Sequence, residues 1–325
     1  MTGGAGYIGG QTVLSLLDCG YDVCVLDDLS TGMRHEFHDQ THFYEGRVHD
    51  QALVKDIIAS HSIRSVLHFA GSIKVDESVS NPLKYYENNT EGSRALVEAC
   101  VAGGVADFIF SSTAAVYGTA PNRPVSEDDE TIPLNPYGWS KLFTERLLED
   151  VAATGALKYG IFRYFNVAGA DPAMRHGQYL EQPVHLIGRS IDALLGIAPP
   201  LTIFGQDLPT PDGTGVRDYI HVADVADAHV SLLEYLQLGG TSQRLNLGYG
   251  TGYSVLEVIN ALIEVTKRDV PFGYGEARAG EAPSVIADTT RLPALLDWRP
   301  KHDNLREILQ TAFDWQVEQA TKKRS

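Results

Sequence analysis

The sequence is poor in cysteine and in basic residues, and each shortage excludes a class of protein. The three cysteines, at 19, 24 and 100, are an odd number without the spacing of a metal site. We interpret them as buried or incidental thiols of a reducing compartment. Lysine and arginine total 26 against 42 aspartates and glutamates, and the net charge is −16. That charge argues against nucleic acid or an anionic membrane as the partner.

Long hydrophobic runs are also missing. No apolar stretch approaches the roughly 20 residues of a membrane-spanning helix. No charged segment followed by an apolar one opens the chain. We therefore predict a soluble, cytoplasmic protein. Apolar residues still make up 43% of 325 positions, which is enough for a large core in one large or two interlocked domains.

The first half of the chain alternates short apolar runs with helix-length segments. We expect strands at 21–27, 64–69, 107–111 and 161–165, and helices at 51–60, 85–102 and 137–153. Near-continuous apolar strands separated by helices are typical of a parallel sheet covered on both faces. The pattern predicts an α/β fold, a doubly wound parallel (Rossmann) sheet.

The second half has a different pattern. Turn-rich segments appear at 205–215 and 273–283, and helices are expected at 223–236, 254–267 and 304–318. We predict a Rossmann domain over 1–166 and a mainly substrate-binding, smaller α/β lobe over 167–325. The two are interleaved, since segments near 216–248 are expected to return to the first domain.

Glycines at 3, 6 and 9 open the chain just before a helix-like segment. Such a turn lets backbone amides approach a pyrophosphate, whose charge the helix N-terminus favours. Asp27 ends the next predicted strand, where a carboxylate binds the adenosine hydroxyls and repels a 2′-phosphate. The combination predicts NAD rather than NADP as the cofactor.

The predicted phosphate loop has no strand in front of it, because only Met1 precedes Thr2. The first strand of such a fold is central, and each of its apolar residues contributes roughly 1.5–3 kcal/mol by burial. We therefore expect the native chain to begin several residues before this Met1.

Tyr137 and Lys141 are spaced to project from one face of a helix. An ammonium beside a phenol favours the phenolate, so we expect Lys141 to lower the pKa of Tyr137. A tyrosine tuned in this way takes a proton from a sugar hydroxyl. Thr113 ends a predicted strand, where its hydroxyl is placed to share that hydrogen bond. Arg217 and Arg278 are suited to clamp a diphosphate.

Six elements together resemble a known family. Besides the 137/141 pair they are TGGAGYIGG at 2–10, LDDLSTG at 26–32, HFAG at 68–71, SSTAAVYG at 111–118 and GTGVRDYIHV at 213–222. The chain resembles the extended short-chain dehydrogenase/reductases and, within them, the UDP-glucose (UDP-galactose) 4-epimerases. The resemblance implies an NAD-dependent isomerase that oxidises C4 of a UDP-sugar and reduces the 4-keto sugar from its other face.

The resemblance also implies roles for individual residues and no metal. The catalytic set would be Tyr137, Lys141 and Thr113. Cofactor contacts would come from Gly3, Gly6, Tyr7, Ile8, Gly9, Asp27, Phe69, Ala70, Asn88, Tyr137, Lys141 and Tyr164. Substrate contacts would come from Thr113, Tyr137, Asn166, His185, Leu186, Phe204, Arg217, Tyr219, Arg278 and Glu281. By analogy the chain would form a homodimer through helices near 85–102 and 137–153.

Three positions depart from the family pattern. Arg47 stands where epimerases often carry an aspartate that binds adenine, and Ile73 stands where many carry a lysine. Val285 stands where many carry a large aromatic residue near the sugar C2. A valine leaves room for an N-acetyl group, so we expect UDP-N-acetylhexosamines to turn over alongside UDP-hexoses.

Rival functions differ in what they require of the sequence. A nucleotide-sugar 4,6-dehydratase needs an acid/base pair after the threonine, and Ala114 and Ala115 occupy those positions. A UDP-uronate epimerase would want an added cation near C6, and no residue stands out for that role. A UDP-pentose 4-epimerase stays open, because a missing C6 group leaves no trace in sequence. A non-catalytic NAD-binding regulator would have no need of Tyr137 or Lys141.

Overall fold

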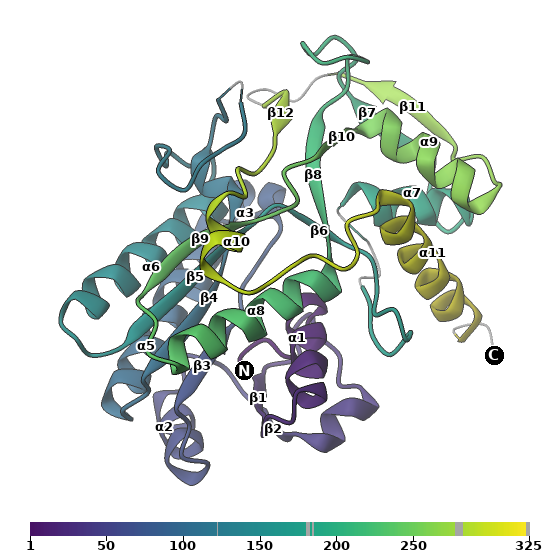
Figure 1. The fold of residues 1–325 in the computed structure, drawn as a ribbon. Coiled ribbons are helices and arrows are strands. Elements are labelled where there is room, and N and C mark those ends of the chain that lie inside the picture. The colour runs from purple at the N-terminus through teal and green to yellow at the C-terminus, as the bar shows by residue number, and fades with distance from the viewer. Residues whose placement is uncertain (122, 180–182, 184, 277–281, 323–325) are drawn as a thin grey trace.

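The computed structural model describes residues 1–121, 123–179, 183, 185–276 and 282–322 (Figure 1). Its α-helices are α1 Tyr7–Asp18, α2 Gln51–Ser60, α3 Val75–Ser80, α4 Pro82–Tyr85, α5 Gly92–Ala102, α6 Pro136–Ala153, α7 Leu186–Leu194, α8 Val222–Gln237, α9 Val255–Thr266, α10 Arg291–Leu295 and α11 Leu305–Lys322. Shorter 3₁₀ or π turns are η1 Glu36–Gln40, η2 Tyr86–Glu91 and η3 Ala114–Tyr117. The strands are β1 Cys24–Asp27, β2 His42–Glu45, β3 Ser65–His68, β4 Asp107–Thr113, β5 Lys158–Tyr164, β6 Asn166–Ala168, β7 Leu201–Phe204, β8 Val216–His221, β9 Gln243–Leu247, β10 Gly252–Ser254, β11 Phe272–Gly275 and β12 Ser284–Val285.

A parallel sheet runs through the larger half of the molecule. β2 pairs with β1, and β3, β4, β5 and β9 follow one another in that order. Each strand is short and apolar, and α2, α5 and α6 cover one face while α1 and α8 cover the other (Figure 1). The predicted doubly wound α/β fold is confirmed, and β9 shows a late segment joining the first sheet.

Thr2 joins the two parts of this sheet. It forms isolated parallel bridges to Leu26 of β1 and to His68 of β3. Its amide donates to the Leu67 carbonyl at 3.0 Å, and its carbonyl accepts from the Phe69 amide at 3.0 Å. A small apolar cavity of about 40 Å³ lies beside this junction. Its lining includes Met1, Val25, Ile57, Ile58, Val66 and Leu96.

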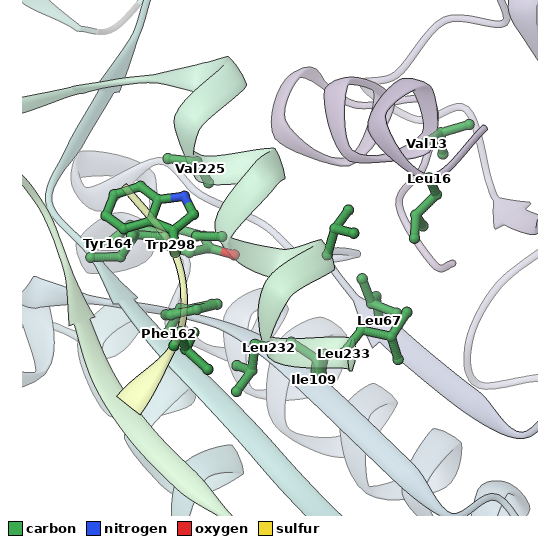
Figure 2. Close-up of a cluster of buried hydrophobic side chains, with 14 of the residues drawn as sticks. Val13, Leu16, Leu67, Ile109, Phe162, Tyr164, Val225, Leu232, Leu233 and Trp298 are labelled. Carbon is green, nitrogen blue, oxygen red and sulfur yellow. The ribbon is translucent and has the colours of Figure 1, made fainter. Parts of the chain in front are cut away.

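Two apolar layers hold the helices onto the sheet. Figure 2 shows the first layer, in which side chains of α1 and α8 pack with those of β3, β4 and β5. Leu16 of α1, Leu232 of α8 and Phe162 of β5 belong to this layer. The second layer lies on the opposite face, where Leu96 of α5 and Leu148 of α6 are almost fully buried. α1 and α8 are buried along most of their surface, because they pack on each other as well as on the sheet.

The smaller lobe is built from short strands and three helices. β8 pairs with β6 and β12 in parallel and with β10 antiparallel, while β7 pairs with β11. Helices α7, α9 and α11 pack against one another and enclose a separate core that includes Ile191, Ile259 and Leu309 (Figure 1).

The predicted helix over 85–102 is helical throughout but not α-helical throughout. α4 ends at Tyr85, a π-helical stretch covers 86–91, and α5 begins at Gly92. The side chain of Asn89 in this stretch bonds to Ser72 and Ser140, which lie on other segments. These tertiary hydrogen bonds outweigh the local preference for a regular helix.

Candidate active site

Tyr137 and Lys141 lie on the first turns of α6. Asn135 caps this helix, and its side-chain oxygen accepts from the Gly138 amide at 2.9 Å. The four-residue spacing then directs both side chains to one face. Lys141 is 3% exposed, and its Nζ donates to the Ser111 carbonyl of β4 at 2.9 Å.

Thr113 meets Tyr137 at the end of β4. The Thr113 hydroxyl lies near enough to the Tyr137 phenol to lower its pKa. Thr113 Oγ1 also accepts from the Ala115 amide at 3.1 Å, which fixes the threonine at the start of η3. The ring of Tyr85 meets that of Tyr137 edge to face, with centroids 6.4 Å apart. The three residues predicted as a catalytic set are therefore brought to one place.

The expected effect of Lys141 on Tyr137 is wrong for this structure. Burial raises the pKa of Tyr137, and the Thr113 hydroxyl opposes that rise. Burial lowers the pKa of Lys141 to about 8, while Glu145 opposes that fall. For each group the cost of removing its charge from water is the largest cause of the shift.

The glycine-rich loop has the geometry of a phosphate cradle. Gly3 has a φ of 69°, and a Cβ there would lie 2.5 Å from the Ala70 amide nitrogen. A Cβ on Gly9 would lie 2.1 Å from the Gly3 carbonyl oxygen. α1 begins after Gly6, and no side chain caps its first amides. Uncapped amides at a helix N-terminus favour a bound anion, so this loop fits the pyrophosphate of a dinucleotide.

Asp27 is tied to the same loop. Its Oδ2 accepts from the Ala5 amide and its Oδ1 from the Leu29 amide, both at 2.9 Å. Burial raises the pKa of Asp27, and these backbone hydrogen bonds oppose the rise. Each carboxylate oxygen keeps a second lone pair, so the group retains acceptors for ribose hydroxyls.

The loop after β3 connects the cofactor side to Lys141. A Cβ on Gly71 would lie 3.6 Å from Lys141 Nζ and 3.1 Å from Asn89 Oδ1. Asn88 donates to Ser72 Oγ at 3.0 Å. Asn89 is the more deeply buried of the two and bonds to both Ser72 and Ser140, yet only Asn88 was predicted. Its position next to Asn88 is the sequence feature that points to it.

Tyr164 and Phe69 meet through His229 of α8. Tyr164 bonds to His229 Nε2 at 2.6 Å, and the Phe69 and His229 rings lie 4.9 Å apart. Thr113 and Tyr164 are register partners at the ends of β4 and β5. The side chains at this end of the sheet are therefore adjacent.

The residues predicted for the substrate lie mainly on the smaller lobe. Asn166 of β6 is the register partner of Tyr219 of β8. The Arg217 guanidinium is half-buried and donates to the Val216 carbonyl at 2.8 Å. The remaining described members are Phe204 at the end of β7, and His185 and Leu186 at the start of α7. Arg278 and Glu281 lie outside the described residues.

The departures from the family pattern also have definite places. The Arg47 side chain is exposed, with its Nε 3.6 Å from Asp28, and Ile73 is exposed as well. Val285 in β12 is the register partner of Arg217 in β8. The valine therefore lies beside one of the predicted diphosphate ligands.

A buried ion pair under the site was missed by the sequence analysis. Arg163 and Glu145 are each 1% exposed and lie 2.6 Å apart, from Nη2 to Oε2. Ser112 also donates to Glu145. Because Ser112 stands between Ser111 and Thr113, this pair anchors the strand end that contacts Lys141. Glu145 continues the four-residue spacing of 137 and 141, and that spacing could have identified it.

Neither a metal-ligand cluster nor a membrane-spanning helix is present in the described part of the chain. No set of three histidine, cysteine, aspartate or glutamate side chains is arranged to hold a metal ion there. Among the described helices, none has the length and apolar character needed to cross a membrane.

Comparison with known proteins agrees with this geometry. Residues 1–248 match the NAD dependent epimerase/dehydratase family. The chain belongs to this family. A UDP-glucose 4-epimerase of Azospirillum brasilense is 48% identical over 97% of this chain and 91% of its own length.

Solved structures agree over nearly the whole chain. A UDP-glucose-4-epimerase from Stenotrophomonas maltophila, with bound NAD and formylated UDP-arabinopyranose, has a TM-score of 0.95 and 38% identity. That match covers 100% of this chain and 98% of the other. The UDP-Glc/GlcNAc 4-epimerase of Campylobacter jejuni has a TM-score of 0.86 and 42% identity, with 98% of each chain covered.

Proposed function

We propose that this chain is an NAD-dependent isomerase that interconverts UDP-glucose and UDP-galactose through a transient 4-keto sugar. The observation that carries the proposal is the meeting of Tyr137, Thr113 and Lys141 at the carboxyl end of β4. This is the edge of a doubly wound sheet where ligands bind. The likeness to UDP-glucose 4-epimerases over nearly the full length of the chain supports it.

The sheet side supplies the cofactor site. The amides of Gly3, Gly6, Tyr7, Ile8 and Gly9 would face the pyrophosphate, and Asp27 would accept from the adenosine ribose. Phe69, Ala70, Asn88, Tyr164 and Lys141 would line the remainder of the site. NAD held by these residues would supply the hydride acceptor and donor for C4 of the sugar.

Tyr137 would take the proton of the sugar 4-hydroxyl and later give it back. Thr113, whose hydroxyl lies beside the Tyr137 phenol, would donate to the reacting oxygen. Lys141, whose Nζ donates to the Ser111 carbonyl at the sheet end, would contact the cofactor there. Ala114 and Ala115 follow Thr113 and cannot transfer protons, which argues against a dehydratase.

The lobe side would anchor the nucleotide while the sugar turns. Arg217 would bind the diphosphate, together with Arg278 from outside the described residues. Phe204 would cover the uracil ring, and Asn166, His185, Leu186, Tyr219 and Glu281 would complete the contacts. A strong hold on the uridine and diphosphate with few contacts to the hexose suits a keto sugar that must present both faces.

Turnover of UDP-N-acetylhexosamines is a second candidate activity. Val285 is the register partner of Arg217 and is small enough to leave room for an acetamido group. The UDP-Glc/GlcNAc epimerase of Campylobacter jejuni, at 42% identity, supports this extension. We expect Val285→Tyr to lose the acetylated activity and retain the hexose activity. Loss of both activities, or of neither, would count against it.

The domain division and the assembly are also proposals. The boundary near residue 166 is supported by the separate cores of the sheet and the smaller lobe. Exposed Leu83 of α4 and Phe143 of α6, 77% and 45% exposed, favour a homodimer through the α4–α5 and α6 surfaces. A cytoplasmic location is supported by the free thiols of all three cysteines.

One experiment tests the function directly. The purified protein is unfolded and the released nucleotide is identified, while the intact protein is given UDP-hexoses, UDP-pentoses and UDP-N-acetylhexosamines in parallel. Released NAD and 4-epimerised hexose products would support the proposal. A protein that releases NAD but epimerises only the pentoses would replace it with the UDP-pentose alternative. Light scattering over a dilution series tests the homodimer.

A further inference from the structure

Three histidines outside the roles above pack behind the glycine-rich loop. His35 precedes η1, His38 lies within it, and His176 comes from the segment after β6. The His35 and His38 ring centroids lie 5.9 Å apart, and those of His35 and His176 lie 5.2 Å apart. His38 and His176 are fully buried. We call these three imidazoles the histidine brace.

Two rings of the histidine brace bond to the loop backbone. His38 Nε2 lies 3.0 Å from the Gly4 carbonyl oxygen. His176 Nε2 lies 2.9 Å from the Tyr7 carbonyl oxygen. A carbonyl only accepts, so both Nε2 atoms carry a hydrogen and donate. Two peptide units of the loop are therefore held from the side opposite their amides.

The other ring nitrogens complete one consistent set of neutral tautomers. His38 Nδ1 accepts from the His35 amide at 2.9 Å, and the His35 side chain accepts from the His38 amide. His35 Nε2 is buried without a partner, so Nδ1 is the accepting atom and Nε2 carries the hydrogen. His176 Nδ1 is also buried without a partner and carries a lone pair.

The environment keeps these rings uncharged. Burial lowers the pKa of His35 to about 3 and that of His176 to about 4. Burial also lowers the pKa of His38, although its bonds with the Gly4 and His35 backbone oppose the shift. Neutral rings are required, because a second ring proton would remove the acceptors in the set above.

The two held peptide units bear on the predicted cofactor site. A peptide is planar and its carbonyl points away from its N–H, so fixing one fixes the other. The Gly4–Ala5 unit is held at its carbonyl by His38 and at its amide by Asp27. The Tyr7–Ile8 unit lies in the first turn of α1, whose amides no side chain caps.

Gly10 gives an independent indication that the His176 contact constrains the sequence. A Cβ at Gly10 would lie 2.6 Å from His176 Nε2 and 2.7 Å from its Cε1. A separation below 3.0 Å requires something to shift. The His176 ring is enclosed on its far side by aromatic side chains, including Tyr179 and Trp315. An alanine at position 10 would therefore displace the ring from the Tyr7 carbonyl.

We propose that His38 and His176 are positioning residues of the NAD site, each acting as a neutral Nε2–H imidazole. His176 orients the Ile8 amide toward the pyrophosphate, and His38 fixes the peptide unit whose Ala5 amide holds Asp27 at the adenosine ribose. The inference deepens the proposed function and rests on it for the identity of the cofactor. The loop is then fixed by contacts from two distant segments as well as by its glycines.

The first test measures NAD release from the full chain. In His176→Gln the amide nitrogen can replace Nε2 as the donor, whereas His176→Leu keeps the apolar volume and has no donor. We expect NAD to leave His176→Leu about tenfold faster than wild type, the size of effect of one lost buried hydrogen bond. His176→Gln should stay near wild type. His221→Leu is the matched control, since His221 is equally buried but bonds to Thr311 and the Ala223 amide.

The outcomes separate this inference from the proposed function. If wild type holds no NAD, the proposed cofactor and the inference both fail. If wild type holds NAD and His176→Leu releases it no faster, only the inference fails. Equal acceleration in His176→Leu and His221→Leu would mean general destabilisation, which also overturns it. The same pair of substitutions at His38 repeats the test at the Gly4 carbonyl.

A mutant cycle and a spectrum complete the test. Gly10→Ala should accelerate NAD release in wild type and add little in the His176→Leu background, because both act through one ring. If the two substitutions accelerate NAD release independently, so that their effects multiply in the double variant, a shared route through the His176 ring is contradicted. Nitrogen-15 spectra of histidine-labelled, NAD-loaded protein should show His38 and His176 as neutral Nε2–H tautomers. A charged ring or an Nδ1–H tautomer at either position overturns the proposal.

Discussion

The sheet side and the lobe side of the site differ in how their polar residues are held. On the sheet side Asp27, Lys141 and Tyr164 are buried, and each bonds to a defined partner. On the lobe side Asn166 and Arg217 are only half-buried, and Arg217 donates to the backbone carbonyls of Val216 and Pro283. A cofactor that stays in place suits the first arrangement. A substrate that enters, turns and leaves suits the second.

This difference predicts which changes alter chemistry, which alter stability and which alter only substrate binding. Changes on the sheet side should affect turnover or folding, because buried polar groups are costly to leave unpaired. Changes on the lobe side should affect mainly the apparent affinity for the substrate. The following predictions run from the largest expected effect to the smallest.

Replacing Tyr137 with phenylalanine should have the largest effect. It removes the group proposed to move the proton, so turnover should fall by about 10²- to 10⁴-fold. The ring and its packing remain, and the unfolding midpoint should change little. Steady-state turnover of UDP-galactose and a urea titration measure the two. Tyr117→Phe is the control, since it also loses a buried hydroxyl bond, to Asn246, outside the proposed chemistry.

Replacing Arg163 with methionine should mainly destabilise the fold. Glu145 would be left as an uncompensated buried charge, at a cost of about 3–5 kcal/mol. The urea midpoint measures this loss. Arg94→Met breaks the exposed Arg94–Glu98 pair instead and should cost about 0.5 kcal/mol or less. Equal losses in the two variants would contradict the special role of the buried pair.

Acid should destabilise the protein through its buried histidines. Burial lowers the pKa of His68 and His221 to about 3 and that of His229 to about 4, against about 6.5 when unfolded. The folded state then binds fewer protons than the unfolded state. The full stabilisation is therefore present above pH 6.5. As the pH decreases below 6.5, the free energy of unfolding decreases by about 1.4 kcal/mol per pH unit for each histidine.

One carboxyl group opposes that trend. Burial raises the pKa of Asp218 to about 6, so its contribution to stability increases as the pH falls below 6. The net result expected from urea titrations is a lower midpoint at pH 5.5 than at pH 7.5. In His221→Gln the free energy of unfolding should depend less steeply on pH, by the contribution of one histidine. An unchanged slope would mean that His221 is not neutral in the folded state.

Replacing Arg217 with lysine should give the smallest effect. A lysine cannot bind a diphosphate bidentately, so the KM for the UDP-sugar should rise about tenfold with kcat little changed. The amount of NAD released on unfolding should match wild type. Loss of NAD in this variant would contradict the division between the sheet side and the lobe side.

The sheet was predictable because its strands are near-continuous apolar runs between amphipathic helices. The π-helical stretch at 86–91 was not, because it depends on bonds from Asn89 to residues distant in sequence. The three-residue strand β6 is too short to give a pattern. The strand pairing of the smaller lobe joins segments as far apart as 166 and 219, which no local periodicity encodes.

The candidate site was predictable where it depends on local spacing. Tyr137 and Lys141 share a helix face. Asp27 ends the strand that follows the glycine-rich loop and its helix. The directions in which the pKa values of Tyr137 and Lys141 shift were not predictable, because they depend on burial. The histidine brace unites His35 and His176 from segments that only the folded chain brings together. Glu145 and Arg163 are likewise brought together only in the folded chain.

The return of β9 to the edge of β5 limits how this protein can be recombined with its relatives. The chain leaves the sheet after β5, builds part of the smaller lobe, and comes back before leaving again (Figure 1). A fragment ending at residue 166 would lack β9, leaving the β5 edge free to pair with other chains. A chimera that exchanges substrate specificity must therefore transplant several separated segments at once, with β9 and α8 kept from the parent that supplies the sheet.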